Sequence, residues 1–144
     1  MMEAVLAPVT YVRGAFLFGE DDIATYLAMV GGGHPVHSSQ ALAQRAGLRA
    51  VPVPGVLVTG AAVAVLGRHF SGQPMALVDV QARFRAPIAV DAEVRVTWTP
   101  AETSPLRSGR RTVEYVGLCQ LVGDETAAEL SARIQLSEMP PAGD

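Results

Sequence analysis

The sequence has little cysteine, few aromatic residues and little charge. One of its 144 residues is a cysteine, 6% are aromatic and 17% are charged, whereas 49% are hydrophobic. A single cysteine excludes an internal disulfide framework and suits the reducing environment of the cytoplasm. The net charge of −3 gives no electrostatic basis for binding nucleic acid or an anionic membrane. Because this charge content is lean for the surface of a monomer, it favours an oligomer, in which an interface covers part of that surface.

Long apolar runs and targeting signals are also lacking. The most apolar segment, residues 51–67, opens with two prolines and is shorter than the roughly 20 apolar residues that span a bilayer. The amino terminus has neither the positive start nor the long apolar stretch of a signal peptide. Since no repeat or linker divides the chain, residues 1–138 are expected to form one domain, followed by a flexible tail over residues 139–144. We interpret segment 51–67 as a buried helix of a cytoplasmic protein.

The first half of the chain has the period of helices. Four apolar residues from Ile23 to Val30 recur at i, i+3, i+4 and i+7, which places them on one face of a helix. The acidic residues 20–22 precede this face, where the helix dipole favours negative charge, so we expect them to be surface residues. The glycines at 31–33 are expected to end the helix, because glycine adopts the left-handed conformation of a C-cap.

Two further helices are predicted before the middle of the chain. Ser38 or Ser39 is expected to cap a short helix that ends at Gly47. The dipeptide Pro54–Gly55 opens the third and most apolar helix, over about residues 56–66. This third helix is rich in alanine and glycine, so another element can approach it closely.

The second half changes to a period of two, which is typical of strands. Apolar and polar residues alternate in most of these segments, whereas segment 111–122 is apolar on both faces, as expected of an interior strand. The connections are short or rich in turn residues, so neighbouring strands are expected to be antiparallel, including the pair joined by residues 85–87. Four strands are predicted, over residues 75–84, 90–99, 111–122 and 126–136.

An apolar helix followed by four antiparallel strands with one polar face indicates an α+β protein whose sheet curls around the helix. This layout is that of the hotdog fold, although the periodicity alone also permits other α+β arrangements. Short sequence motifs are needed to narrow the choice.

Three motifs, in this order, resemble the MaoC-like hydratase/dehydratase family of hotdog enzymes. FGEDDIATYLAMVGGGHPVH, residues 18–37, is similar to the family's first helix and hydratase loop, of the form G-D-x-N-P-[IL]-H. QALAQRAGLRAVPVPGVLV, residues 40–58, resembles the family's next helix, the loop after it and the start of the central helix. ARFRAPIAVDAEVRV, residues 82–96, resembles the family's strand pair. The resemblance covers about residues 16–136. It implies a hotdog fold and a reaction that needs no cofactor. The implied substrate is an acyl thioester of CoA or of an acyl carrier protein, in polyketide or fatty acid metabolism.

The loop departs from the family's motif at the position of the catalytic acid. His37 and the dipeptide Pro35–Val36 match the motif, but Gly32 stands at the aspartate position and His34 at the asparagine position. In the family, this aspartate and the histidine form the acid/base pair. The central helix also resembles that of the β-hydroxyacyl-carrier-protein dehydratases, whose catalytic glutamate position is Gly60 here. Glycine therefore occupies both acid positions, and the standard reaction should be slow unless another group substitutes.

The candidate catalytic residues are His37, as the base, and His34, as a substitute for the missing acid. A histidine ordinarily has a pKa of about 6.5, which suits proton transfer near neutrality. His34 either shares the proton transfers or merely caps the glycine-rich turn. Free N–H groups at the start of the central helix could stabilise an enolate oxygen. The residues expected to bind the substrate or its oxyanion are Gly55, Val56, Gly32 and Gly33.

The remaining candidates each have an ordinary alternative. Arg83 and Arg85 could bind a CoA phosphate or the acidic face of a carrier protein, or be surface arginines. Two histidines without a third ligand make a poor metal site, so no metal is expected. Cys119 alternates with strand core residues and is interpreted as a packing residue.

These observations leave three hypotheses for function. The first is an atypical hydratase/dehydratase, or a double-bond isomerase, in which His37 is the base. The second is a non-catalytic hotdog subunit or acyl-binding protein, because glycine at both acid positions is what loss of catalysis would leave. The third, less favoured, is a hotdog thioesterase, since no carboxylate is evident near the helix start. The resemblance implies a homodimer, with a heterodimer as the alternative.

Overall fold

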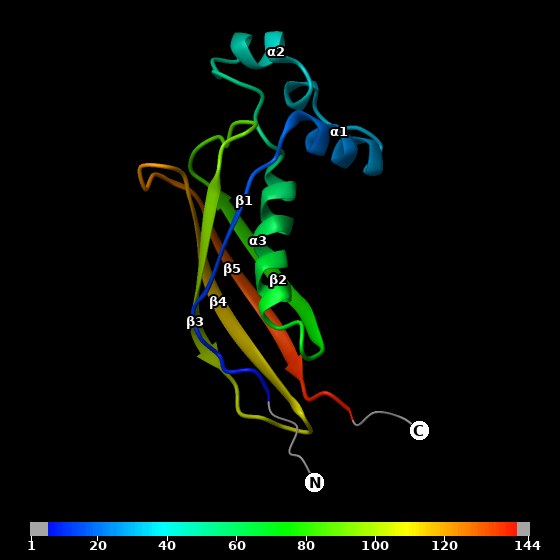
Figure 1. Cartoon of the computed structure of the whole chain (residues 1–144), viewed down its shortest axis with the longest axis vertical. Coiled ribbons are helices and arrows are strands. Elements are labelled where there is room, and N and C mark those ends of the chain that lie inside the picture. Colours follow the sequence, from blue (N-terminus) through cyan, green and yellow to red (C-terminus); the bar gives the residue numbers. More distant parts are fainter. Residues whose placement is uncertain (1–5, 141–144) are drawn as a thin grey trace.

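The computed structural model describes residues 6–140 and places a long helix against one face of an antiparallel sheet (Figure 1). Two short helices stand beyond the amino-terminal end of the long helix. The elements in chain order are β1 (Val12–Phe16), α1 (Glu20–Met29), the 3-10 turn η1 (Pro35–His37), α2 (Gln40–Arg45), α3 (Gly55–His69), β2 (Met75–Phe84), β3 (Val94–Thr103), β4 (Arg110–Gln120) and β5 (Thr126–Ser137).

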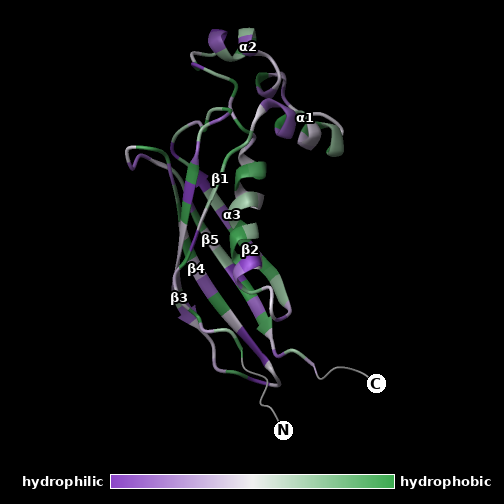
Figure 2. Ribbon diagram, in the orientation of Figure 1, coloured by the Kyte–Doolittle hydropathy of each residue, from purple (hydrophilic) through white to green (hydrophobic). Residues whose placement is uncertain are grey.

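The strands form one sheet in the order β1-β3-β4-β5-β2, and every neighbouring pair is antiparallel. α3 lies along one face of this sheet, which is the α+β hotdog layout predicted from the sequence. Figure 2 shows that α3 is hydrophobic along most of its length, as expected of a central helix. The helix extends beyond the predicted residues 56–66 at both ends.

Trp98 of β3 anchors α3 to the sheet. Its side chain is fully buried, and its Nε1–H donates a hydrogen bond of 2.8 Å to the carbonyl oxygen of Ala62 in α3. Gly117 pairs with Trp98 across β3 and β4, and a Cβ atom on Gly117 would lie 2.7 Å from the indole ring. Only glycine therefore leaves room for the indole that holds α3 in position.

The prediction of an interior strand near residues 111–122 is confirmed, because β4 lies between β3 and β5. Its two apolar faces differ in environment. Val113 and Tyr115 are fully buried in the core to which α3 also contributes, whereas Val116 and Leu118 on the opposite face are 50% and 39% exposed.

The prediction of four strands was incomplete, because β1 is a fifth strand at one edge of the sheet. It has five residues, one of which is Gly14, so its alternation is too short to stand out in the sequence. The prediction that the strands joined by residues 85–87 are neighbours was wrong. β2 pairs with β5, whereas β3 pairs with β1 and β4.

β3 begins later than the strand predicted over residues 90–99, because the residues before it pair elsewhere. Val53 N–H donates to Ile88 O at 2.7 Å, and Val90 N–H donates to Val51 O at 2.9 Å. The connection between β2 and β3 therefore holds the segment that leads into α3, which a short-range sequence pattern does not reveal.

No helix within residues 6–140 is long and apolar enough to cross a membrane. The tail predicted over residues 139–144 lies outside the described residues from residue 141 onward. Residues 139 and 140 have no regular secondary structure.

Candidate functional site

The glycine run after α1 folds the chain sharply back toward the helix. Gly31 and Gly32 have φ values of +82° and +100°, a left-handed backbone that residues with a Cβ rarely adopt. Gly32 N–H donates to Leu27 O at 2.7 Å, and Gly33 lies against the Leu27 side chain. The predicted role of these glycines in ending α1 is confirmed, and the turn delivers the chain directly into η1.

His34 forms the N-cap of η1. Its Nδ1 accepts a hydrogen bond of 3.1 Å from the backbone N–H of Val36, and the residue is exposed. Because Nδ1 accepts, the neutral ring carries its proton on Nε2. This hydrogen bond corresponds to the capping role, which was the alternative to a role of His34 in proton transfer.

His37, at the end of η1, is held in a defined orientation. Its Nδ1 lies 2.8 Å from the carbonyl oxygen of Pro52. A carbonyl oxygen only accepts, so Nδ1 carries the proton in the neutral ring and Nε2 keeps its lone pair. The half-buried imidazole can therefore accept a proton through Nε2.

The first backbone N–H groups of α3 have no hydrogen-bond acceptor within the helix. Leu57 and Val58 N–H donate to Pro54 O at 3.1 and 3.2 Å. Gly55 and Val56 are the first two residues of the helix, so their N–H groups have no intrahelical acceptor and lie at the positive end of its dipole. They are free to bind a carbonyl oxygen or an anion.

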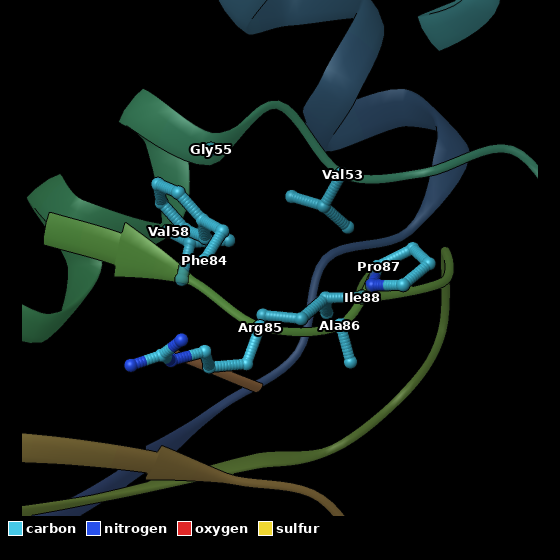
Figure 3. Close-up of a pocket in the computed structure, with 8 residues that line it drawn as sticks. All are labelled: Val53, Gly55, Val58, Phe84, Arg85, Ala86, Pro87 and Ile88. Atoms are coloured by element: carbon cyan, nitrogen blue, oxygen red, sulfur yellow. The ribbon is translucent and has the colours of Figure 1, made fainter. Parts of the chain in front are cut away.

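A cavity of about 370 Å³ opens beside this helix start (Figure 3). Phe84 packs on Gly55, where a Cβ atom would lie 2.9 Å from the phenyl ring. Arg85 also lines the cavity, and its guanidinium is paired with Glu129 at 3.0 Å. The lining is mostly apolar: Val53, Gly55, Val58, Phe84, Arg85, Ala86, Pro87 and Ile88.

His37 does not line this cavity. It lines a second one, of about 320 Å³, on the α1 side of segment 51–54. This second cavity is lined by Glu20, Asp21, Ile23, Ala24, Leu27, His37, Ser38 and Val51. The predicted base and Gly55, one of the predicted oxyanion donors, thus line different cavities, with His37 bonded to Pro52 and Gly55 three residues further along.

The other predicted site residues lie outside both cavities. His34, Gly32 and Gly33 are exposed in the loop, and Arg83 lines a separate hollow with Gln81. Gly60 is exposed on α3, with nothing within 4 Å of the place where its Cβ would be. The prediction that the acidic residues 20–22 are surface residues is confirmed, because all three are exposed. Glu20 and Asp21 also line the cavity that His37 lines, which their position at a helix start did not indicate.

Neither a cysteine nucleophile nor a metal site accompanies these residues. Burial raises the pKa of the Cys119 thiol to about 11, so at neutral pH it is a protonated packing residue. No group of three or more His, Cys, Asp or Glu side chains within residues 6–140 could hold a metal ion. The polar groups in or beside the two cavities include the His37 imidazole, the first backbone N–H groups of α3 and the carboxylates of Glu20 and Asp21.

No protein-family model matches the sequence, and no curated protein matches it at a significant level. Several solved structures are similar to this chain. The (R)-hydratase from A. caviae involved in PHA biosynthesis superposes with a TM-score of 0.76 at 20% identity, over 93% of this chain and 98% of that one. The HadBC 3R-hydroxyacyl-ACP dehydratase complex from Mycobacterium tuberculosis gives a TM-score of 0.76 at 20% identity, over 91% and 99%. A MaoC-like dehydratase gives 0.74 at 18% identity, over 90% and 42%.

These structural similarities identify the fold of the chain. The chain has the hotdog fold, and the solved structures similar to it include MaoC-like dehydratases and (R)-hydratases, in agreement with the motifs in its sequence. At these identities the likeness concerns the fold, and the activity has to be argued from the site itself.

Proposed function

We propose that the protein is a hydratase/dehydratase of the MaoC-like type that acts on an acyl thioester of CoA or of an acyl carrier protein. The observation that carries this proposal is the hydrogen bond from His37 Nδ1–H to Pro52 O at 2.8 Å. It leaves Nε2 as a base beside the segment that leads into α3. Gly55 follows Pro52 by three residues, a separation of at most about 10 Å, and we expect one thioester to reach both the imidazole and the helix start.

In dehydration, neutral His37 takes the α-proton of a 3-hydroxyacyl thioester through Nε2. The electron pair moves to the thioester oxygen, which accepts hydrogen bonds from the N–H groups of Gly55 and Val56. The enolate then expels the β-hydroxyl as water, with a proton from a second group, and the enoyl thioester remains. Hydration is the reverse of these steps. The apolar cavity beside Phe84 is suited to the acyl chain, and Arg83 and Arg85 to a phosphate or an acidic carrier.

We further propose that the active form is a dimer made through β2. This strand is at the edge of the sheet, and a long unpaired edge is an aggregation hazard that proteins usually cover. Leu77 on β2 is 44% exposed, Phe84 is 45% exposed and Val56 at the start of α3 is 73% exposed. A second copy of this chain would cover this apolar surface, and a related hotdog chain is the alternative. The single domain over residues 1–138 and a cytoplasmic location remain part of this proposal.

A second candidate, a non-catalytic hotdog subunit, is favoured by one specific observation. The loop offers no carboxylate, and the left-handed backbone at Gly32 disfavours any side chain there. Turnover of crotonyl-CoA and crotonyl-acyl carrier protein, together with calorimetric binding of both, separates the two. The proposal predicts hydration of at least one of them. Binding of a thioester with no turnover would instead identify a subunit that has lost catalysis.

A further inference from the structure

The cavity that contains His37 has carboxylates on its other wall. Its volume is about 320 Å³, and the wall formed by α1 contains Glu20 and Asp21. His37, Ser38 and Val51 line the rest. Neither carboxylate lies within 4 Å of a positively charged side chain among residues 6–140. A base and free carboxylates therefore border one space large enough for a reacting group.

The neighbouring acidic residue, Asp22, has a different and purely local role. Its Oδ2 accepts a hydrogen bond of 2.8 Å from Gly19 N–H and so caps the start of α1. Glu20 and Asp21 have no such bond within the described part of the chain. The dipole of α1 explains a preference for acidic residues there but not their position on a cavity.

Helical spacing singles out Glu20. Positions i, i+3, i+4 and i+7 share one face of a helix, and the cavity is lined by Glu20, Ile23, Ala24 and Leu27. Glu20 is the polar member of that face, whereas Asp21 lies at its margin. Both residues are exposed, and the side chain of a glutamate is one methylene longer than that of an aspartate.

We propose that Glu20 is the second proton-transfer residue of the site and replaces the acid that the loop lacks. The proposal rests on the hydratase/dehydratase activity proposed above. In the resembling family the acid comes from the loop position that is Gly32 here. In this chain it comes from the first turn of α1, across the cavity from His37.

His37 and Glu20 together supply both proton transfers of the dehydration. In dehydration, His37 Nε2 takes the proton from Cα, and the pair of that C–H bond forms the Cα–Cβ double bond. The Cβ–O bond breaks, and the oxygen leaves as water with the proton of the Glu20 carboxyl group. The enzyme is left with an imidazolium and a carboxylate, and solvent exchange of one proton restores the starting state. In hydration, the Glu20 carboxylate takes a proton from water and the His37 imidazolium protonates Cα.

Two reactions separate the roles of the two residues. Exchange of the α-protons of butyryl-CoA with D2O needs the base and the oxyanion donors only, because butyryl-CoA has no hydroxyl to expel. Dehydration of (R)-3-hydroxybutyryl-CoA needs the acid as well. Loss of a general acid typically costs about 10²–10⁴-fold in rate. Glu20→Gln should therefore lose at least 100-fold in dehydration and keep α-proton exchange within about threefold of wild type.

The controls are Asp21→Asn, which removes the neighbouring charge, and Glu20→Asp, which keeps a carboxyl group. We expect Asp21→Asn to dehydrate like wild type and Glu20→Asp to regain part of the rate. Dehydration at the wild-type rate by Glu20→Gln, an equal loss of both reactions, or loss in Asp21→Asn instead would overturn the assignment. If wild type shows no His37-dependent exchange, the proposed function itself fails, and the role of Glu20 fails with it.

Discussion

The packing of Trp98 on Gly117 makes a quantitative prediction for Gly117→Ala. The added Cβ atom would lie 2.7 Å from the indole ring, and that ring cannot move freely because it is fully buried and bonded to Ala62 O. Overpacking of this kind costs about 1–3 kcal/mol. Loss of the tryptophan hydrogen bond would add about 1 kcal/mol. We therefore expect the free energy of unfolding to fall by about 2–4 kcal/mol, and the melting temperature by roughly 5–15 °C.

Chemical denaturation followed by circular dichroism measures this loss, and Gly67→Ala is the matched control. Gly67 lies in α3, and a Cβ atom there would make only an ordinary contact, 3.9 Å from Met75. Since alanine favours a helix over glycine by about 0.5–1 kcal/mol, this variant should be slightly more stable than wild type. A Gly117→Ala protein within about 0.5 kcal/mol of wild type, at the same denaturant dependence, would refute the packing argument, because overpacking costs at least about 1 kcal/mol.

The edge strand and the loop give two further predictions. Leu77→Lys places a charge on the exposed apolar surface of β2 and should convert a dimer to a monomer in light scattering, whereas Val116→Lys, on the opposite face of the sheet, should leave the dimer intact. A dimer in both variants would show that β2 is not the interface. Gly32→Asp restores the aspartate of the resembling loop but forces it into a backbone with φ of +100°. It should lower stability by about 1–3 kcal/mol without raising turnover, and a clear gain in crotonyl-CoA hydration would contradict this.

Local patterns in the sequence are sufficient for most of the fold. The spacing of apolar residues in α1, the glycines after it, the alternation in β2 and β5 and the two apolar faces of β4 act over a few residues, so they can be read directly. Ser39, one of the two predicted caps, accepts a bond of 3.1 Å from Leu42 N–H at the start of α2. The exceptions are long-range. β1 becomes a strand because β3 offers it a partner, and the residues before β3 pair with segment 51–53.

The candidate site shows the same division. The motif around His37 predicted a base, but its orientation depends on Pro52, fifteen residues away, and no local pattern contains that bond. Glu20 was predicted to be a surface residue from its charge at a helix start, and that prediction did not include its place in the lining of the cavity that His37 lines. Its spacing of three, four and seven residues from the apolar residues of α1 was the available signal that it faces the same side as they do.

The role of His37 Nε2 as the base is tested by the turnover number of (R)-3-hydroxybutyryl-CoA dehydration in His37→Ala. His34→Ala is its control, because His34 lies in the same loop and its side chain accepts a hydrogen bond from Val36 N–H rather than bonding to His37. We expect a fall of about 10²–10⁴-fold in His37→Ala and a change of less than about tenfold in His34→Ala. Turnover in His37→Ala equal to that of wild type would contradict this role.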